Sequence, residues 1–299
     1  MKNANAIKLS RQDKTLNALV YVIIIVLTLV VLYPIVYIVS ASFSSTTAIA
    51  QGRVWLWPVE FSTQAYEVLL EYEDIWVGYR NTIFYTVVAT VLNVGLTMMC
   101  AFPMARKDLK GRGFLSMFFT FTMLFSGGMI PNYLLVKSLG MVNTRWAMII
   151  PGAMSVYNMI VARTFIQSNI HDELMEAAKI DGCDDFRFFF QIVLPLSKAI
   201  IAVLALWYAV SHWNAYFNAF LYLTDKDKYP LQIFLREILV QNQFSSDAFT
   251  SSIEAVQKEQ LQLLLKYAVI VVSTLPLFAF YPLAQKYFVK GVMIGSVKG

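Results

Sequence analysis

LNALVYVIIIVLTLVVLYPIVYIVS, residues 16–40, contains no charged residue and is almost entirely apolar. About 20 consecutive apolar residues are needed for an α-helix to cross the hydrocarbon core of a bilayer. The stretch is long enough for this, and we predict a transmembrane helix over residues 17–39. It is too long for a cleaved signal peptide, and no clear small-residue cleavage site follows it.

Five further uncharged stretches follow along the chain, at residues 81–105, 114–136, 146–162, 199–224 and 267–285. Each is comparable in length to one membrane crossing. The sequence therefore predicts an all-α, polytopic membrane protein forming a single transmembrane domain over residues 1–299. Its six helices are expected at about residues 17–39, 80–104, 114–136, 146–165, 194–223 and 265–286.

The composition supports lipid as the solvent of this chain. Of its 299 residues 58% are hydrophobic and 14% are charged, whereas about a quarter of residues are charged in soluble domains. The net charge of +5 comes from short basic clusters between apolar stretches, so we predict a bilayer partner and no nucleic acid. The two cysteines, Cys100 and Cys183, do not indicate a disulfide framework.

The distribution of Lys and Arg predicts the orientation, because cytoplasmic loops of membrane proteins are enriched in these residues. With six spans, the basic clusters before the first helix, between the second and third, and after the sixth all fall on one side. The first loop on the other side, residues 41–78, is acidic. Both termini are therefore expected in the cytoplasm, with outer loops at residues 41–78 and 225–262. The clusters are Lys2, Lys8, Arg11 and Lys14; Arg106, Lys107, Lys110 and Arg112; and Lys286, Lys290 and Lys298.

The predicted spans contain few ionisable side chains. His212 is the one clear ionisable side chain at mid-membrane depth, and ion-coupled carriers need such groups. We interpret His212 and Asn93 as hydrogen-bonding residues between helices. The chain also lacks GxxxxGK[ST], so it cannot cradle a nucleotide itself. We predict no catalytic residue, no cofactor and no metal site, because His171 and His212 fall on different elements without ligand spacing.

The connection between the fourth and fifth predicted helices is unusual for a cytosolic loop because it is acidic. Within it we predict a structured segment over residues 169–191, which we call the coupling segment. Asn169 can cap a first short helix, Gly182 ends it in a left-handed conformation, and Asp184 can cap a second. An amphipathic hairpin on the lipid surface is the alternative, although anionic inner-leaflet lipid favours basic helices. The acidic residues are Asp172, Glu173, Glu176, Asp181, Asp184 and Asp185.

At this segment the sequence resembles a known family. The run Glu176-Ala177-Ala178-Lys179-Ile180-Asp181-Gly182, followed by Phe189, Ile192 and Leu194-Pro195, is similar to the EAA motif of ABC importer permeases. The carbohydrate-importer branch is indicated by Trp57-Pro58, residues 128–131, Trp213-Asn214 and the closing Val297-Lys298-Gly299, the last resembling the smaller permease of maltose-type transporters. His171, Cys183 and Ala199 depart from the usual pattern, and none of them is a docking residue.

The resemblance implies a type I ABC importer permease in the bacterial inner membrane. Its partners would be a second permease subunit, a dimer of cytosolic ATP-binding subunits, an extracytoplasmic solute-binding protein and a carbohydrate substrate. Such a subunit is not an enzyme, because the ATPase hydrolyses ATP. A facilitative channel or a secondary carrier not coupled to ATP is the alternative. The residues implied in ATPase docking are Glu176, Ala177, Ala178, Asp181, Gly182, Phe189 and Pro195, and Lys298 and Gly299 are implied in a tail contact with the ATPase.

The fifth predicted helix carries side chains suited to sugars, which bind aromatic faces flanked by amide and hydroxyl groups. We predict a substrate pathway at Trp213, Asn214, Tyr216 and Asn218. The alternative is that these aromatic residues pack between helices or anchor at the membrane interface. We favour packing for Trp213 and a minor pathway role for Asn214. The outer segment 225–262 is expected to contain a helix and to contact the binding protein.

Overall fold

We describe the fold from a computed structural model of the chain, over residues 10–241 and 262–279. Within these ranges every regular element is helical, as the sequence predicts. The chain divides into two compact units, residues 1–71 with 242–273 and residues 72–241 with 274–299. The single transmembrane domain over residues 1–299 stays a prediction.

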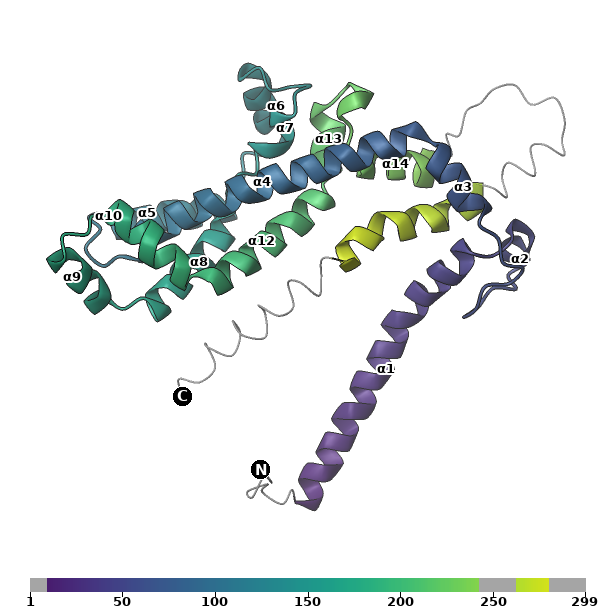
Figure 1. Cartoon of the computed structure of the whole chain (residues 1–299), viewed down its shortest axis with the longest axis horizontal. Helices are drawn as coiled ribbons and strands as arrows, with labels where there is room; N and C mark the ends of the chain where they lie inside the picture. Colours follow the sequence, from purple (N-terminus) through teal and green to yellow (C-terminus); the bar gives the residue numbers. More distant parts are fainter. Residues whose placement is uncertain (1–9, 242–261, 280–299) are drawn as a thin grey trace. The chain divides into compact units, whose positions relative to one another are not determined.

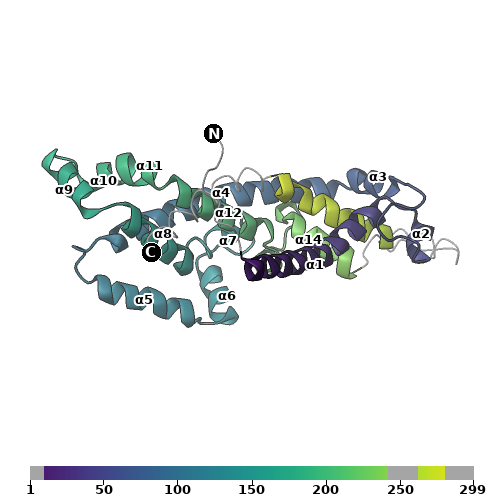
Figure 2. The same cartoon turned by 90° about the horizontal axis from the view of Figure 1, so that it is seen from below.

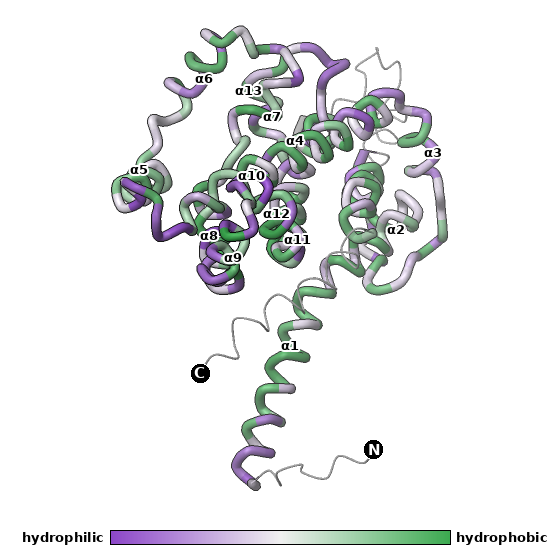
Figure 3. Tube along the Cα trace, turned by 60° about the vertical axis from the view of Figure 1, so that its left-hand side comes forward, coloured by the Kyte–Doolittle hydropathy of each residue, from purple (hydrophilic) through white to green (hydrophobic). Residues whose placement is uncertain are grey.

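The first unit begins with α1 (Arg11–Ser42), a helix of 32 residues. Ser10 accepts a hydrogen bond from the Asp13 amide, and the Asp13 side chain accepts one from the Ser10 amide, so a capping box starts the helix. Beyond its polar first turn, α1 is apolar along most of its length (Figure 3). Its side chains are exposed up to residue 35, as expected of a surface in contact with lipid or another chain.

A compact loop follows α1 and includes α2 (Thr46–Ala50) and α3 (Gln64–Glu71). Ser45 caps α2, and its hydroxyl donates to Glu60, which also pairs with Arg53 at 2.7 Å. The hydroxyl of Ser40 donates to the carbonyl of Leu56 at 2.6 Å. These contacts fold the loop back onto the end of α1. A further helix covers Gln262–Ala279.

The core of the second unit is the 33-residue helix α4 (Glu73–Ala105), which packs against α8 (Val156–Asn169) and α12 (Lys198–Trp213), as Figure 1 shows. Polar side chains connect these helices within the apolar packing. The hydroxyls of Thr97 and Tyr208 lie 2.7 Å apart, and Asn93 is 2.8 Å from Nε2 of His212. The interpretation of His212 and Asn93 as hydrogen-bonding residues between helices is therefore confirmed.

Three of the predicted helices are interrupted in the structure. The predicted helix 114–136 is divided into α5 (Arg112–Leu124) and α6 (Met129–Ser138), bent by 111° (Figure 2). Gly128 adopts φ +88 at this break, a conformation that suits glycine. The predicted helix 146–165 becomes α7 (Trp146–Ile149) and α8, separated by a turn containing Pro151, which cannot donate to a helix, and Gly152.

The predicted helix 194–223 is also divided. It begins as α11 (Leu194–Leu196), bends by 80° into α12, and resumes after Asn214 as α13 (Phe217–Tyr222). In the described residues, three helices are long and apolar enough to cross a membrane, or up to five if each bent pair forms one span. The number of six spans therefore remains a prediction.

The start of the predicted outer segment 225–262 packs on the N-terminal half of α4. It contains the short helix η2 (Lys226–Lys228), then α14 (Leu231–Arg236) and the π-helix η3 (Glu237–Gln241). The side-chain amide of Asn81 donates to the carbonyls of Asp227 and Tyr229 at 2.8 and 3.0 Å. The expectation of helix in this segment is confirmed for these residues, and residues 242–261 lie outside the described ranges.

Gly78 permits the close approach of α4 and α14. A Cβ at this position would lie 2.9 Å from the Cα of Leu231 and 2.9 Å from the Phe234 ring. We expect Gly78→Ala to lower the melting temperature of the purified permease, because overpacking costs about 1–3 kcal/mol and exceeds the helix-propensity gain of about 1 kcal/mol. Gly95→Ala is the control, since its Cβ would meet nothing within 4 Å. An unchanged melting temperature in Gly78→Ala would contradict this packing.

Candidate docking surface

The coupling segment forms two short helices at the C-terminal end of α4 (Figures 1 and 2). The first is α9 (Asp172–Ile180) and the second is α10 (Asp185–Phe188), which continues into the π-helix η1 (Phe189–Val193). Asp184 caps α10 through a 2.7 Å hydrogen bond from the Arg187 amide, and Gly182 has φ +74. The predicted cap at Asp184 and the left-handed turn at Gly182 are therefore confirmed.

The predicted cap at Asn169 is wrong. His171 occupies the N-cap position of α9 and makes no side-chain capping bond. The side-chain amide of Asn169 instead donates to the backbone carbonyl of Phe165 at 2.8 Å, because α8 continues through Asn169. The start of α9 is supported by Asp172 and Glu173, whose negative charges lie in its first turn and interact favourably with the helix dipole.

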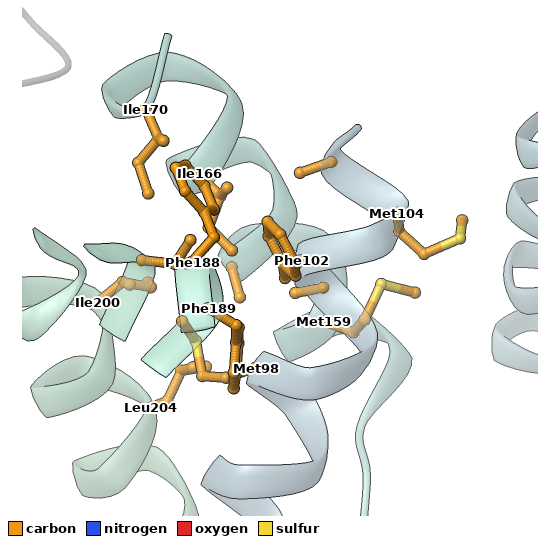
Figure 4. Close-up of a cluster of buried hydrophobic side chains, with 14 of the residues drawn as sticks. Met98, Phe102, Met104, Met159, Ile166, Ile170, Phe188, Phe189, Ile200 and Leu204 are labelled. Carbon is orange, nitrogen blue, oxygen red and sulfur yellow. The ribbon is translucent and has the colours of Figure 1, made fainter. Parts of the chain in front are cut away.

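An apolar cluster attaches this segment to the helical core (Figure 4). Phe188 and Phe189 are 2% and 6% exposed, and their rings lie 6.0 and 5.5 Å from the ring of Phe102 on α4. Ala178 is buried in the same cluster. Among the residues implied in docking, Ala178 and Phe189 therefore hold the segment in place and cannot themselves form its outer surface.

The outer surface is formed by other residues of the segment. Five of the residues implied in docking are exposed: Glu176, Ala177, Asp181, Gly182 and Pro195. Two large apolar side chains that the sequence reasoning missed accompany them, Ile180 at 87% and Phe186 at 79% exposure. Their signal in the sequence is an apolar residue between a basic and an acidic neighbour, as in Lys179-Ile180-Asp181 and Asp185-Phe186-Arg187. We define the docking surface as the exposed residues Glu176, Ala177, Ile180, Asp181, Gly182 and Phe186.

Part of the acidity of the segment is neutralised within the chain. Asp172 pairs with Lys107 at 2.7 Å, and Asp185 pairs with Arg106. Arg106 also bonds Asp108, which holds the pKa of Asp108 low, at about 2. The loop after α4 thus supports the segment electrostatically. Within the described residues no ion pair involves Glu176, so its charge remains available to a partner.

The predicted pathway residues differ in exposure and lie on both sides of a helix break, and their role stays a prediction. Trp213 is buried, at 4% exposure, with its ring 6.4 Å from that of Tyr79. Asn214 and Tyr216 are exposed, and Asn218 is half-buried on α13, beyond the helix break. These residues therefore do not share one continuous helix, although the sequence predicts one over residues 194–223. Lys298 and Gly299 lie outside the described residues.

We expect Trp213→Ala to reduce the yield of assembled complex, because a cavity of this size costs about 3–5 kcal/mol. Transport per assembled complex should stay near the wild-type value. Trp146→Ala is the control, since Trp146 is 55% exposed and its loss leaves no interior cavity. Full yield with reduced transport per complex would instead assign Trp213 to the substrate pathway.

This architecture matches a known protein family and a solved structure. Residues 75–294 match the family described as binding-protein-dependent transport system inner membrane component. A crystal structure of a bacterial ABC transporter involved in the import of the acidic polysaccharide alginate contains a chain with a TM-score of 0.84 and 33% identity. The match covers 95% of this chain and all of that one.

Curated relatives are similar over nearly the full length. The polygalacturonan/rhamnogalacturonan transport system permease protein YtcP of Bacillus subtilis (strain 168) is 40% identical, covering 96% of this chain and 100% of the relative. Protein LplC of the same organism is 42% identical, covering 90% of each. The fold is that of an ABC transport permease. The chain belongs to the family of binding-protein-dependent transport system inner membrane components.

Proposed function

We propose that this chain is the permease subunit of an ATP-driven oligosaccharide importer and docks a cytosolic ATPase through the docking surface. The observation that carries the proposal is that Glu176, Ile180 and Phe186 are exposed on a segment whose other side is fixed to α4 by Phe188 and Phe189. A carboxylate beside large apolar side chains is suited to a protein cleft with a basic residue.

The orientation follows from the basic clusters. Both termini and the docking surface would lie in the cytoplasm, and the chain would cross the membrane six times. The chain itself would hydrolyse nothing, and the energy of ATP would come from a dimer of ATPase subunits. Closure of that dimer would move α9 and α10, and with them the core helices α4 and α8, so that the pathway shared with a second permease opens alternately to each side.

The substrate class is supported by the relatives. YtcP is named for polygalacturonan and rhamnogalacturonan, and the matched structure for alginate, an acidic polysaccharide. We propose that the substrate is an oligosaccharide containing uronic acid residues, delivered by an extracytoplasmic solute-binding protein. The exposed Asn214 and Tyr216 would contribute hydrogen bonds and a ring face to its passage.

Uptake by cells that express the complete transporter tests this function. Labelled oligogalacturonides and alginate oligosaccharides should enter in an ATP-dependent manner, whereas a neutral oligosaccharide of equal length should enter much more slowly. Entry that persists in cells whose ATPase subunit carries an inactivating substitution would contradict ATP coupling. Equal uptake of neutral and acidic oligosaccharides would contradict the substrate class alone.

A further inference from the structure

Two arginines near the junction of α5 and α8 have no acidic partner among the residues that the structure describes. Arg112 is the first residue of α5, and Arg163 lies on α8. Both are half-buried, and Ser116, to which Arg163 bonds, lies one helical turn after Arg112 on α5. Arg163 donates to the Ser116 hydroxyl at 3.2 Å, and Arg112 donates to the Arg106 carbonyl at 3.3 Å. These bonds leave most of their N–H donors free for a further ligand.

Three nearby carboxylates are already paired with other cations, and no ion pair up to 4.0 Å joins Glu173 to either arginine. Asp172 pairs with Lys107, and Asp108 and Asp185 pair with Arg106. Within the described residues, no ion pair up to 4.0 Å involves Arg112 or Arg163. Two like charges that are partly shielded from water are unfavourable without a counter-charge. Neither arginine therefore has an ion-pair partner of its own among the described residues.

A cavity of about 420 Å³ opens beside Arg112 and is lined by Arg106, Lys107 and Arg112, together with Asp172 and Glu173. Next to it, α5 exposes large apolar side chains. Phe114, Met117 and Phe118 are 66%, 65% and 52% exposed. A polar, cationic recess thus adjoins an apolar helix face, an arrangement that suits a molecule with an anionic head and apolar chains.

We propose that Arg112 and Arg163 bind the phosphate group of an anionic phospholipid, with its acyl chains along the exposed face of α5. Guanidinium groups bind phosphate through paired hydrogen bonds. The carboxylates of Asp172 and Glu173 in the cavity disfavour a multiply charged soluble anion, whereas a phosphodiester carries a single charge. The choice of the cytoplasmic leaflet rests on the orientation in the proposed function, since basic pockets on that side bind anionic headgroups.

Native mass spectrometry of the assembled transporter tests this site, with phosphatidylglycerol as the probe and phosphatidylcholine as the neutral reference. A basic residue that contacts an anionic headgroup contributes about a fivefold gain in lipid affinity. Arg163→Gln and Arg112→Gln should each weaken phosphatidylglycerol binding about fivefold and leave phosphatidylcholine unchanged. Arg163→Lys should keep part of the affinity. Lys110→Gln is the matched control, because Lys110 is an exposed residue of the same basic loop.

Three results would overturn the proposal. The first is unchanged phosphatidylglycerol binding in the double variant. The second is displacement of the lipid by millimolar inorganic phosphate, which would make this a soluble-anion site. The third is loss of the second permease from the Arg163→Gln complex with lipid binding intact, which would assign the arginines to a carboxylate of that partner. Lipid binding is measured without transport or ATP hydrolysis, so failure here is distinguishable from failure of the docking assignment.

Discussion

Glu176→Lys should abolish coupled transport while leaving membrane insertion and permease yield normal. Glu176 is exposed on α9, and no ion pair within the described chain uses its charge. If it faces Arg or Lys in an ATPase cleft, reversing its charge places two cations together in a partly desolvated contact. Loss of one member of such a pair is costly because the other stays unpaired. We expect substrate-stimulated ATP hydrolysis to fall about a hundredfold or more.

The control for this variant is Glu71→Lys, a charge reversal at an exposed acid in the predicted outer loop. It changes the net charge by the same amount and should leave coupling intact. Glu176→Gln should be milder, since it removes the attraction without adding repulsion. Wild-type transport by Glu176→Lys in an intact complex would show that the ATPase does not bind at this residue.

Gly182→Val should weaken binding of the ATPase without unfolding the permease. Gly182 has φ +74, and a Cβ there would meet nothing within 4 Å. The substitution therefore lowers stability through backbone strain rather than through a clash. A left-handed conformation costs about 1–2 kcal/mol of folding free energy for a residue with a side chain, and more for a β-branched residue such as Val. Relief of that strain would turn α10 relative to α9 and displace Phe186 from the docking surface. We expect less ATPase to co-purify with the variant.

Gly140→Val is a matched control for this strain. Gly140 has φ +67, and a Cβ there would also meet nothing within 4 Å, but it lies after α6 and outside the docking surface. Both variants should lose similar stability in a thermal melt. Only Gly182→Val should lose ATPase, and equal co-purification of ATPase with the two variants would contradict the role of this turn.

Local sequence signals predicted the turn and the second helix cap of the coupling segment. Gly182 and Asp184 specify a turn and a cap through their own backbone and side-chain chemistry, so no distant contact was needed. Asn169 shows the limit of such signals. Its amide had a competing acceptor in its own helix, the carbonyl of Phe165, and the sequence does not say where α8 ends.

Other features depend on residues far apart in the chain. The pairs Lys107–Asp172 and Arg106–Asp185 join segments that the sequence separates widely, so the internal neutralisation of the acidic segment was not predictable. The break after Asn214 contains neither Gly nor Pro, and hydropathy alone favours a continuous helix. Ile180 and Phe186 were missed because hydrophobicity alone does not show whether an apolar residue of a short helix faces the core, as Phe188 does, or solvent.

The most direct test of the central claim is photo-crosslinking from Phe186 in the assembled transporter. A photoreactive phenylalanine analogue at position 186 replaces an exposed aromatic side chain with one of similar shape. The same analogue at Trp57, which is 80% exposed in the predicted outer loop, is the control. The docking account predicts an ATPase adduct from position 186 and none from position 57. An intact complex that gives no ATPase adduct from position 186, or gives one from position 57, would contradict it.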